Sequence, residues 1–206
     1  MIEVHSTKTY QRLACAHSQF FDKEPDGSPG ECSSVHGYDR TVTLTFSGEI
    51  DDNGWIVPFG ELQEVKKFLE YYFDHTIVLP ANDKRIRDIP VGMLNPGGLF
   101  AKLRILPYGV SMEMSSLFIW ELVSSYITHM TQGRCYVSRV ECREHECNSA
   151  YVTADRETAM KLYDAMVGGG KRFHNDPTGL MLTKDEGWEY INPKHALEWY
   201  NNPLSE

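Results

Sequence analysis

Hydrophobic and polar residues alternate along two early stretches of the chain, and this alternation predicts two strands. In residues 35–47 one face is apolar at every second position, with threonine or serine between: Val42, Leu44 and Phe46. Extending the same parity backwards adds three polar positions to that face: His36, Tyr38 and Arg40. Residues 3–17 form the other predicted strand, in which Leu13, Cys15 and His17 share a face. The turn residues between the two strands predict a loop over 18–31.

Later stretches repeat apolar residues at helical spacing. This spacing predicts helices over 59–73, 112–130 and 155–167. A turn at 51–54 predicts that a short strand at 55–58 forms a hairpin with 35–50. Alternation predicts one more strand at 134–144, with Glu144 at its end, and the irregular stretch before it has room for a short strand within 99–106. The order of these elements favours an α+β fold, an antiparallel sheet with helices on one face.

The C-terminal stretch differs in composition from the rest of the chain. We expect a core domain over 1–153 and, over 154–206, a helix followed by an extension packed on the core. Three glycines at 168–170 are typical of a helix end. Beyond them the chain is polar but rich in aromatic residues, which favours docking over a free tail: Phe173, Trp188, Tyr190, Trp199 and Tyr200.

Overall charge and composition exclude several classes of protein. The chain has 206 residues, 41% of them hydrophobic, and a formal net charge of −9. An acidic surface argues against binding to nucleic acid or an anionic membrane. No apolar run approaches the roughly 18 residues of a membrane helix, and residues 1–10 lack the apolar core of a signal peptide. We therefore expect a cytoplasmic protein whose cysteines are free thiols.

Several residues that carry chemistry lie near the predicted strands. Cys32 precedes a strand in a loop near histidines, where its pKa would be lowered if it were a reactive thiolate, although an ordinary loop thiol fits equally well. Asp74-His75 follows a predicted helix and is typical of an oriented imidazole, although such neighbours also arise by chance. His17 and His36 on adjacent strands suit a shared metal, although zinc usually takes three or four ligands. Glu144 is placed to accept N–H groups of an aminopyrimidine ring, or else is a solvated strand end.

Taken in order, these residues resemble the 6-pyruvoyl-tetrahydropterin synthase / 6-carboxytetrahydropterin synthase family over about residues 8–153. The resemblance begins with Ala14-Cys15-Ala16-His17 and continues with Cys32 followed by His36-Gly37-Tyr38. Gly54-Trp55-Ile56-Val57-Pro58-Phe59 and Asp74-His75 come next. Val110-Ser111-Met112-Glu113-Met114 and Arg143-Glu144-His145 complete the set.

The resemblance implies a fold and an assembly. The family has the tunnelling fold, in which four antiparallel strands carry two helices on one face. Its subunits form homo-oligomeric rings, commonly a hexamer made of two trimers, with pterin pockets between subunits.

The resemblance also implies an activity: a lyase that converts dihydroneopterin triphosphate to 6-carboxytetrahydropterin on the route to 7-deazaguanines such as preQ0 and queuosine. Cys32, Asp74 and His75 would move protons. Glu144, with Ser111 and Glu113, would bind the pterin, and the metal-site positions would hold Zn2+: His17, His36 and Tyr38.

The chain departs from the family pattern at the metal site. Tyr38 stands where the family has a third zinc histidine, and a phenolate is a rarer metal ligand. Two alternatives therefore stay open beside the lyase. One is a related pterin- or purine-binding enzyme with an altered metal site, and the other is a non-catalytic protein that forms the same ring.

Overall fold

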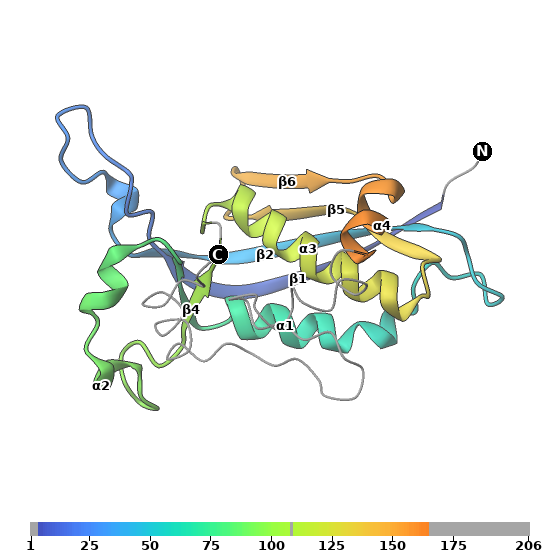
Figure 1. Cartoon of the computed structure of the whole chain (residues 1–206), viewed down its shortest axis with the longest axis horizontal. Helices are drawn as coiled ribbons and strands as arrows, with labels where there is room; N and C mark the ends of the chain where they lie inside the picture. The colour runs from blue at the N-terminus through green and yellow to red at the C-terminus, as the bar shows by residue number, and fades with distance from the viewer. Residues whose placement is uncertain (1–3, 108, 165–206) are drawn as a thin grey trace.

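A mixed sheet of six strands organises the described part of the chain (Figure 1). The structure, a computed structural model, describes residues 4–107 and 109–164. The strands run in the spatial order β4-β3-β1-β2-β5-β6. In chain order they are β1 (Val4–His17), β2 (His36–Gly48), β3 (Thr76–Pro80), β4 (Leu103–Leu106), β5 (Cys135–Arg143) and β6 (Ser149–Thr153).

Within these residues, two long helices and two short ones accompany the sheet. They are α1 (Gln63–Phe73), α2 (Val91–Leu94), α3 (Met112–Met130) and α4 (Arg156–Tyr163). Short 3-10 turns occupy Glu31–Ser33, Phe59–Leu62 and Lys84–Asp88. In the parts of the chain described, no helix has both the length and the apolarity to cross a membrane.

The core lies between the sheet and the pair α1 and α3, which run along it (Figure 1). The apolar face predicted for β2 is fully buried there, since Val42, Leu44 and Phe46 are each 0% exposed. The two helices also touch each other, because the rings of Phe68 and Phe118 lie 5.9 Å apart. The α+β class is therefore confirmed, with helices on one face of the sheet.

The strand count and direction differ from the expected four antiparallel strands. β1, β2, β5 and β6 pair antiparallel, as expected. β3 adds to β1 in parallel, and β4 adds to β3 in parallel. The sequence allowed a short strand within 99–106, where β4 lies. It did not indicate β3 or the parallel direction, because turn residues in the proline- and glycine-rich stretch after α1 interrupt any regular hydrophobic period.

The hairpin predicted at 55–58 is wrong. Instead, the Asp51 carboxylate accepts hydrogen bonds from the backbone N–H groups of Asn53 and Trp55, each at 2.9 Å, which closes a tight turn. Ile56 and Val57 then pack into the core at 4% exposure each. Burial in a loop produced the apolar pattern that resembled a strand.

Bulges shift the alternation in two strands. In β1 the register breaks between Tyr10 and Leu13, where Arg12 has a φ of 64°. This bulge keeps Leu13, Cys15 and His17 on the buried face, so the predicted shared face is confirmed. In β5 a second break in the register, opposite Thr45 and Phe46, interrupts the alternation. Val137 therefore packs in the core, where strict alternation back from Val140 would place Ser138.

The C-terminal predictions are met only in part by what the structure describes. α4 begins within the predicted range, with Asp155 as its N-cap accepting from the Thr158 N–H at 2.8 Å. Ala159 of α4 is fully buried in the main core. The glycines at 168–170 and the aromatic residues after them lie outside the described residues, and the boundary at 153 stays a prediction.

Candidate functional site

The antiparallel pairing of β1 with β2 brings two histidines face to face. His17 ends β1, His36 begins β2, and the two are direct partners in the register. Their ring centroids are 4.4 Å apart. This closeness follows from the sheet, because directly opposed side chains on one face lie within about 5.5 Å at Cβ.

Glu144 reaches the same point from the end of β5. Its backbone N–H donates to the Asn148 carbonyl at 3.0 Å, which fixes the turn between β5 and β6. Its Oε1 lies 3.8 Å from Nε2 of His17. Ligand atoms of His17, His36 and Glu144 all lie within 4.8 Å of one another, so the three residues form a candidate metal site.

His17 is the most constrained member of this group. It is 1% exposed, and among the described residues neither of its ring nitrogens has a hydrogen-bond partner. Burial lowers the pKa of His17 to about 3, and the positive charge of Arg40 and the neighbouring His36 act in the same direction. The imidazole is therefore neutral at pH 7, the form that binds a metal.

Tyr38, the third predicted metal ligand, lies at the rim of this group. Its ring centroid is 6.4 Å from that of His17 and 5.9 Å from that of His36. The side chain is 39% exposed and also contacts the ring of His145 at 5.6 Å. Tyr38 thus adjoins the two histidines, with its ring shared between them and His145.

A cavity of about 370 Å³ opens beside the histidines and is lined by the residues expected to bind substrate. Ser111, Glu113 and Glu144 all line it, together with His17 and Gln19. Ser111 is the N-cap of α3, where its hydroxyl accepts from the Met114 N–H at 3.3 Å. The carboxylate that follows β5, a second carboxylate from α3 and the His17 ring therefore line one space, and His36 lies next to His17.

Cys32 lies in the 3-10 turn of the loop before β2. Its carbonyl accepts from the Gln19 N–H at 2.8 Å, and its own N–H donates to the Asp22 carboxylate at 3.0 Å. These bonds hold the thiol-bearing turn beside the end of β1, close to the cavity.

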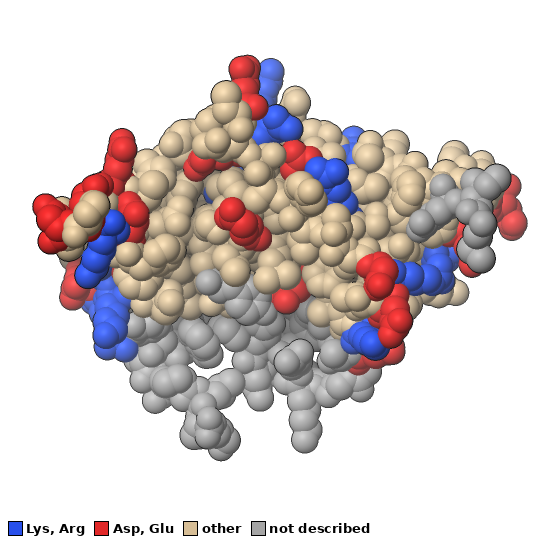
Figure 2. Space-filling view, turned by 90° about the horizontal axis from the view of Figure 1, so that it is seen from above, with Lys and Arg blue, Asp and Glu red and all other residues tan. Residues whose placement is uncertain are grey.

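The expected lowering of the Cys32 pKa is wrong for the single chain. The pKa is raised, first by desolvation and then by the negative charges of Asp22, Glu144 and Glu31. Figure 2 shows acidic side chains gathered at the end of the molecule formed by this loop. The sequence pointed to nearby histidines, but the charged side chains that act on the thiol are carboxylates.

The Asp74-His75 pair joins α1 to β3. The imidazole Nδ1 lies 2.7 Å from Asp74 Oδ1, so the carboxylate fixes the ring tautomer. The His75 backbone N–H donates to the Ala14 carbonyl on β1 at 2.7 Å, and His75 adopts a φ of 56°. The His75 side chain is 75% exposed, so it faces outward from this chain.

One structural feature of the site was missed in the sequence. Arg85, in the 3-10 turn after β3, donates to the Ser33 carbonyl at 2.8 Å and to the Ser18 hydroxyl at 2.6 Å. Its guanidinium also forms an ion pair with the fully buried Asp83, at 2.7 Å. Arg85 thus ties the residues next to His17 and Cys32 together, and no local sequence signal marks it.

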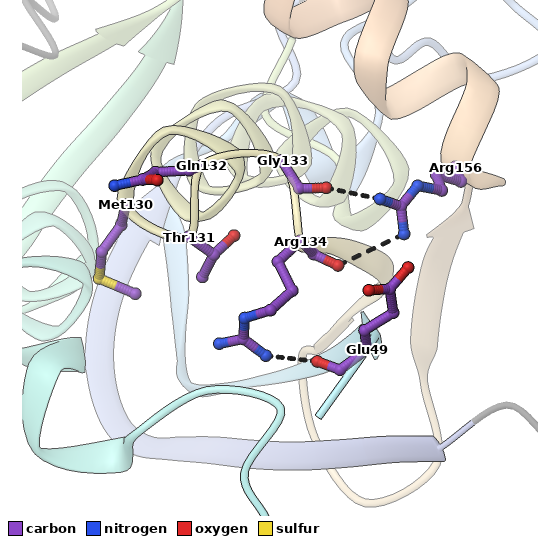
Figure 3. Close-up of a pocket in the computed structure, with 7 residues that line it drawn as sticks. All are labelled: Glu49, Met130, Thr131, Gln132, Gly133, Arg134 and Arg156. Carbon is purple, nitrogen blue, oxygen red and sulfur yellow. Dashed lines mark hydrogen bonds between the residues drawn. The ribbon is translucent and has the colours of Figure 1, made fainter. Parts of the chain in front are cut away.

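A second cavity, of about 600 Å³, lies at the other end of α3 (Figure 3). Two arginines line it, but their guanidinium groups donate to backbone carbonyls. Arg134 donates to Glu49 and Trp55, and Arg156 donates to Gly133 and Arg134. These bonds hold the turn after α3 against the loop after β2, so we assign this cavity a structural role.

Comparison with known proteins agrees with this arrangement. A family model described as 6-pyruvoyl tetrahydropterin synthase matches residues 6–155. The chain belongs to this family. The resemblance stated from the sequence is therefore confirmed, and the matched region contains all the candidate site residues.

Individual relatives are similar over shorter or more divergent stretches. A 6-carboxy-5,6,7,8-tetrahydropterin synthase of Bacillus subtilis (strain 168) is 44% identical over 55 residues, which are 26% of this chain and 36% of that protein. The match thus spans little more than a third of the length of that relative.

Solved structures show the shared fold. An uncharacterized protein of Wolinella succinogenes superposes with a TM-score of 0.63 at 17% identity, covering 75% of this chain and all of the other. A Plasmodium vivax 6-pyruvoyltetrahydropterin synthase, in a catalytic residue mutant, gives 0.53 at 19% identity, covering 74% and 99%.

Proposed function

We propose that this protein is a lyase of the 6-carboxytetrahydropterin synthase type. It would convert dihydroneopterin triphosphate to 6-carboxytetrahydropterin with loss of triphosphate and acetaldehyde, as a step toward 7-deazaguanines. The observation that carries the proposal is that His17, Glu113 and Glu144 line one cavity, with His36 beside His17 and Glu144, in a chain of this family.

The substrate would enter the cavity with its pterin ring toward the carboxylates. An aminopyrimidine ring offers adjacent N–H donors, and a carboxylate accepts them with charge-assisted hydrogen bonds. Glu113 and Glu144 are the carboxylates that line the space, and Ser111 adds a hydroxyl. The ring would therefore be held at this end, with its side chain directed toward the histidines.

Proton transfer would fall to the thiol and to the acid–imidazole pair. Cys32, once deprotonated, would act as the base that removes a proton from the substrate side chain, and its raised pKa makes the thiolate a strong base. His75, with its tautomer fixed by Asp74, would relay protons. A metal held by the histidines would, when bound, polarise the side-chain oxygens of the substrate.

The exposure of His75 supports a site completed between subunits. A general acid or base works away from bulk water, yet His75 is 75% exposed in the single chain. We therefore propose a homo-oligomeric ring, such as a hexamer of two trimers, with the thiol and the Asp74-His75 pair meeting across an interface.

The activity is tested by incubating the full chain and a divalent metal with dihydroneopterin triphosphate. We expect 6-carboxytetrahydropterin and acetaldehyde to form, as followed by chromatography and a coupled aldehyde assay. Cys32→Ala should abolish turnover, whereas Ser34→Ala, an exposed neighbour in the same loop, should not. Pterin binding without acetaldehyde release by the metal-loaded wild type would overturn the lyase.

A second function is favoured by the replacement at Tyr38. A pterin- or purine-binding protein of this fold with different chemistry would keep the carboxylate-lined cavity but not the third histidine. Calorimetry with the intact pterin and with guanine would show binding without conversion in that case.

A further inference from the structure

We infer that Glu144, and not Tyr38, is the third protein ligand of a divalent-metal site whose other two ligands are His17 and His36. This inference deepens the proposed function at the same site, and it concerns metal binding rather than substrate turnover. The sequence predicted a metal site made only of residues from β1 and β2. The inferred site instead takes its third ligand from the residue that follows β5.

The first argument is the condition of His17. A buried polar side chain almost always has a hydrogen-bond partner, because leaving one unmade costs about 1–3 kcal/mol. Both ring nitrogens of His17 are buried with no such partner among the described residues, and the ring is 1% exposed. A metal ion bonded to one nitrogen removes part of this cost and explains why a histidine occupies the position.

The second argument is the approach of Glu144. Its Oε1 is 3.8 Å from His17 Nε2, which is longer than a hydrogen bond. Two ligand atoms each about 2.1 Å from one ion are separated by roughly 3–4 Å in common geometries. The separation therefore suits two ligands of a shared ion better than a direct contact between the residues.

His36 completes the group with a fixed ring. Its Nδ1 lies 2.8 Å from the Ser34 carbonyl, so this nitrogen carries the proton and Nε2 is free to bind a metal. A histidine held through its other nitrogen by a backbone carbonyl is the usual outer-shell arrangement of metal sites.

The third argument separates Glu144 from Tyr38. Carboxylate oxygens are ordinary zinc ligands, whereas a phenolate is a rarer one. Glu144 Oε1 lies 3.8 Å from His17 Nε2, whereas the Tyr38 ring centroid is 6.4 Å from that of His17 and the Tyr38 ring also contacts His145. Ligand chemistry and placement both favour the carboxylate.

This ligand set has consequences for the metal. Two imidazoles and one carboxylate with open positions suit catalytic Zn2+ and also Fe2+. The carboxylate cancels one of the two positive charges, so the ion polarises substrate less strongly than it would in a three-histidine site. With one oxygen of Glu144 on the metal, Glu113 becomes the principal carboxylate for the ring.

Metal titration of the chelator-treated full chain tests the inference. Co2+ binding is followed by its visible absorption and Zn2+ binding by calorimetry, both without pterin. Wild type should bind one ion per chain. Glu144→Gln should weaken binding by more than about tenfold, since even outer-shell losses cost 10–100-fold. Tyr38→Phe should bind as wild type does, and circular dichroism checks that each variant is folded.

A spectroscopic measurement on the wild type avoids any dependence on a variant. X-ray absorption of the Zn2+ form should show two imidazole ligands and oxygen neighbours. Three imidazoles, wild-type affinity in Glu144→Gln, lost affinity in Tyr38→Phe, or no binding by wild type would each overturn the inference. Metal bound as described by a protein that does not convert dihydroneopterin triphosphate would leave it standing while the lyase proposal fails.

Discussion

The ion pair between Arg85 and Asp83 makes a stability prediction that can be worked out from the structure. Asp83 is 0% exposed, and its carboxylate accepts from the Arg85 guanidinium at 2.7 to 3.1 Å and from the Arg85 backbone N–H at 2.9 Å. Replacing Arg85 by Met keeps the apolar stem but leaves a buried carboxylate with only its backbone bond.

The expected loss of unfolding free energy for Arg85→Met lies between the loss for a surface ion pair and the loss for a fully buried one. Removing one partner of a fully buried pair costs about 3–5 kcal/mol, and exposed pairs contribute about 0–1 kcal/mol. Because the Arg85 side chain is 50% exposed, solvent screens part of the loss, and we expect about 2 kcal/mol for Arg85→Met. For a chain of this size that corresponds to a Tm decrease of about 4–8 °C.

A double-mutant cycle isolates the pair. Arg85→Met, Asp83→Asn and the double variant are unfolded in urea, with Lys84→Met, an exposed neighbour in the same turn, as the control. Asp83→Asn keeps an acceptor for the Arg85 N–H but removes the charge. We expect a coupling energy above about 1 kcal/mol, larger than for surface pairs. A coupling below about 0.5 kcal/mol would refute the idea that burial of Asp83 strengthens the pair.

Three further predictions concern the site. The rate at which iodoacetamide labels Cys32, followed by peptide mass spectrometry, should rise only at pH values above the ordinary cysteine pKa. The raised pKa of Cys32 leaves its reactive thiolate scarce at lower pH. Rapid labelling at pH 7 would contradict this. Gly37→Ala should lower the free energy of unfolding by about 1–3 kcal/mol and weaken Co2+ binding, because the added Cβ would lie 2.8 Å from the Cys15 carbonyl oxygen, between the two strands that carry the histidines. Gly60→Ala, with open space around the added Cβ, is the control. Equal melting temperatures for the two variants would count against the argument. Mixing inactive Cys32→Ala with inactive His75→Ala subunits should restore part of the turnover if sites form across interfaces, whereas no recovery in exchanged oligomers would exclude shared sites.

Local pattern determined much of the fold. The buried faces of β1 and β2 followed from a period of two, since alternate side chains of a strand point to opposite sides. α3 matched its predicted range of 112–130, because apolar residues recur along it at helical spacing and Ser111 caps its start. The ordered motifs also indicated the family.

Apolar stretches mislead secondary-structure prediction where the residues are buried without forming a helix or strand. Ile56 and Val57 resembled a strand because they are apolar, but they enter the core from a loop. β3 pairs with β1 in parallel, and β4 pairs with β3 in parallel. The sequence allowed a short strand near β4, but the short length of β3 and the turn residues around it leave no period to detect there. The face of β5 depended on a bulge that alternation cannot locate.

The candidate site shows the same division. The sequence by itself placed His17 and His36 on two adjacent strands, because each strand follows from its alternation and a loop joins them. The register that makes them direct partners came from the structure. Only the tertiary structure decided that Glu144 comes within 3.8 Å of His17, since β2 lies between the strands that carry them. It also decided that carboxylates surround Cys32 and that Arg85 reaches Ser33. The physical reason is that charge and metal geometry depend on distances between segments far apart in the chain, which no local period encodes.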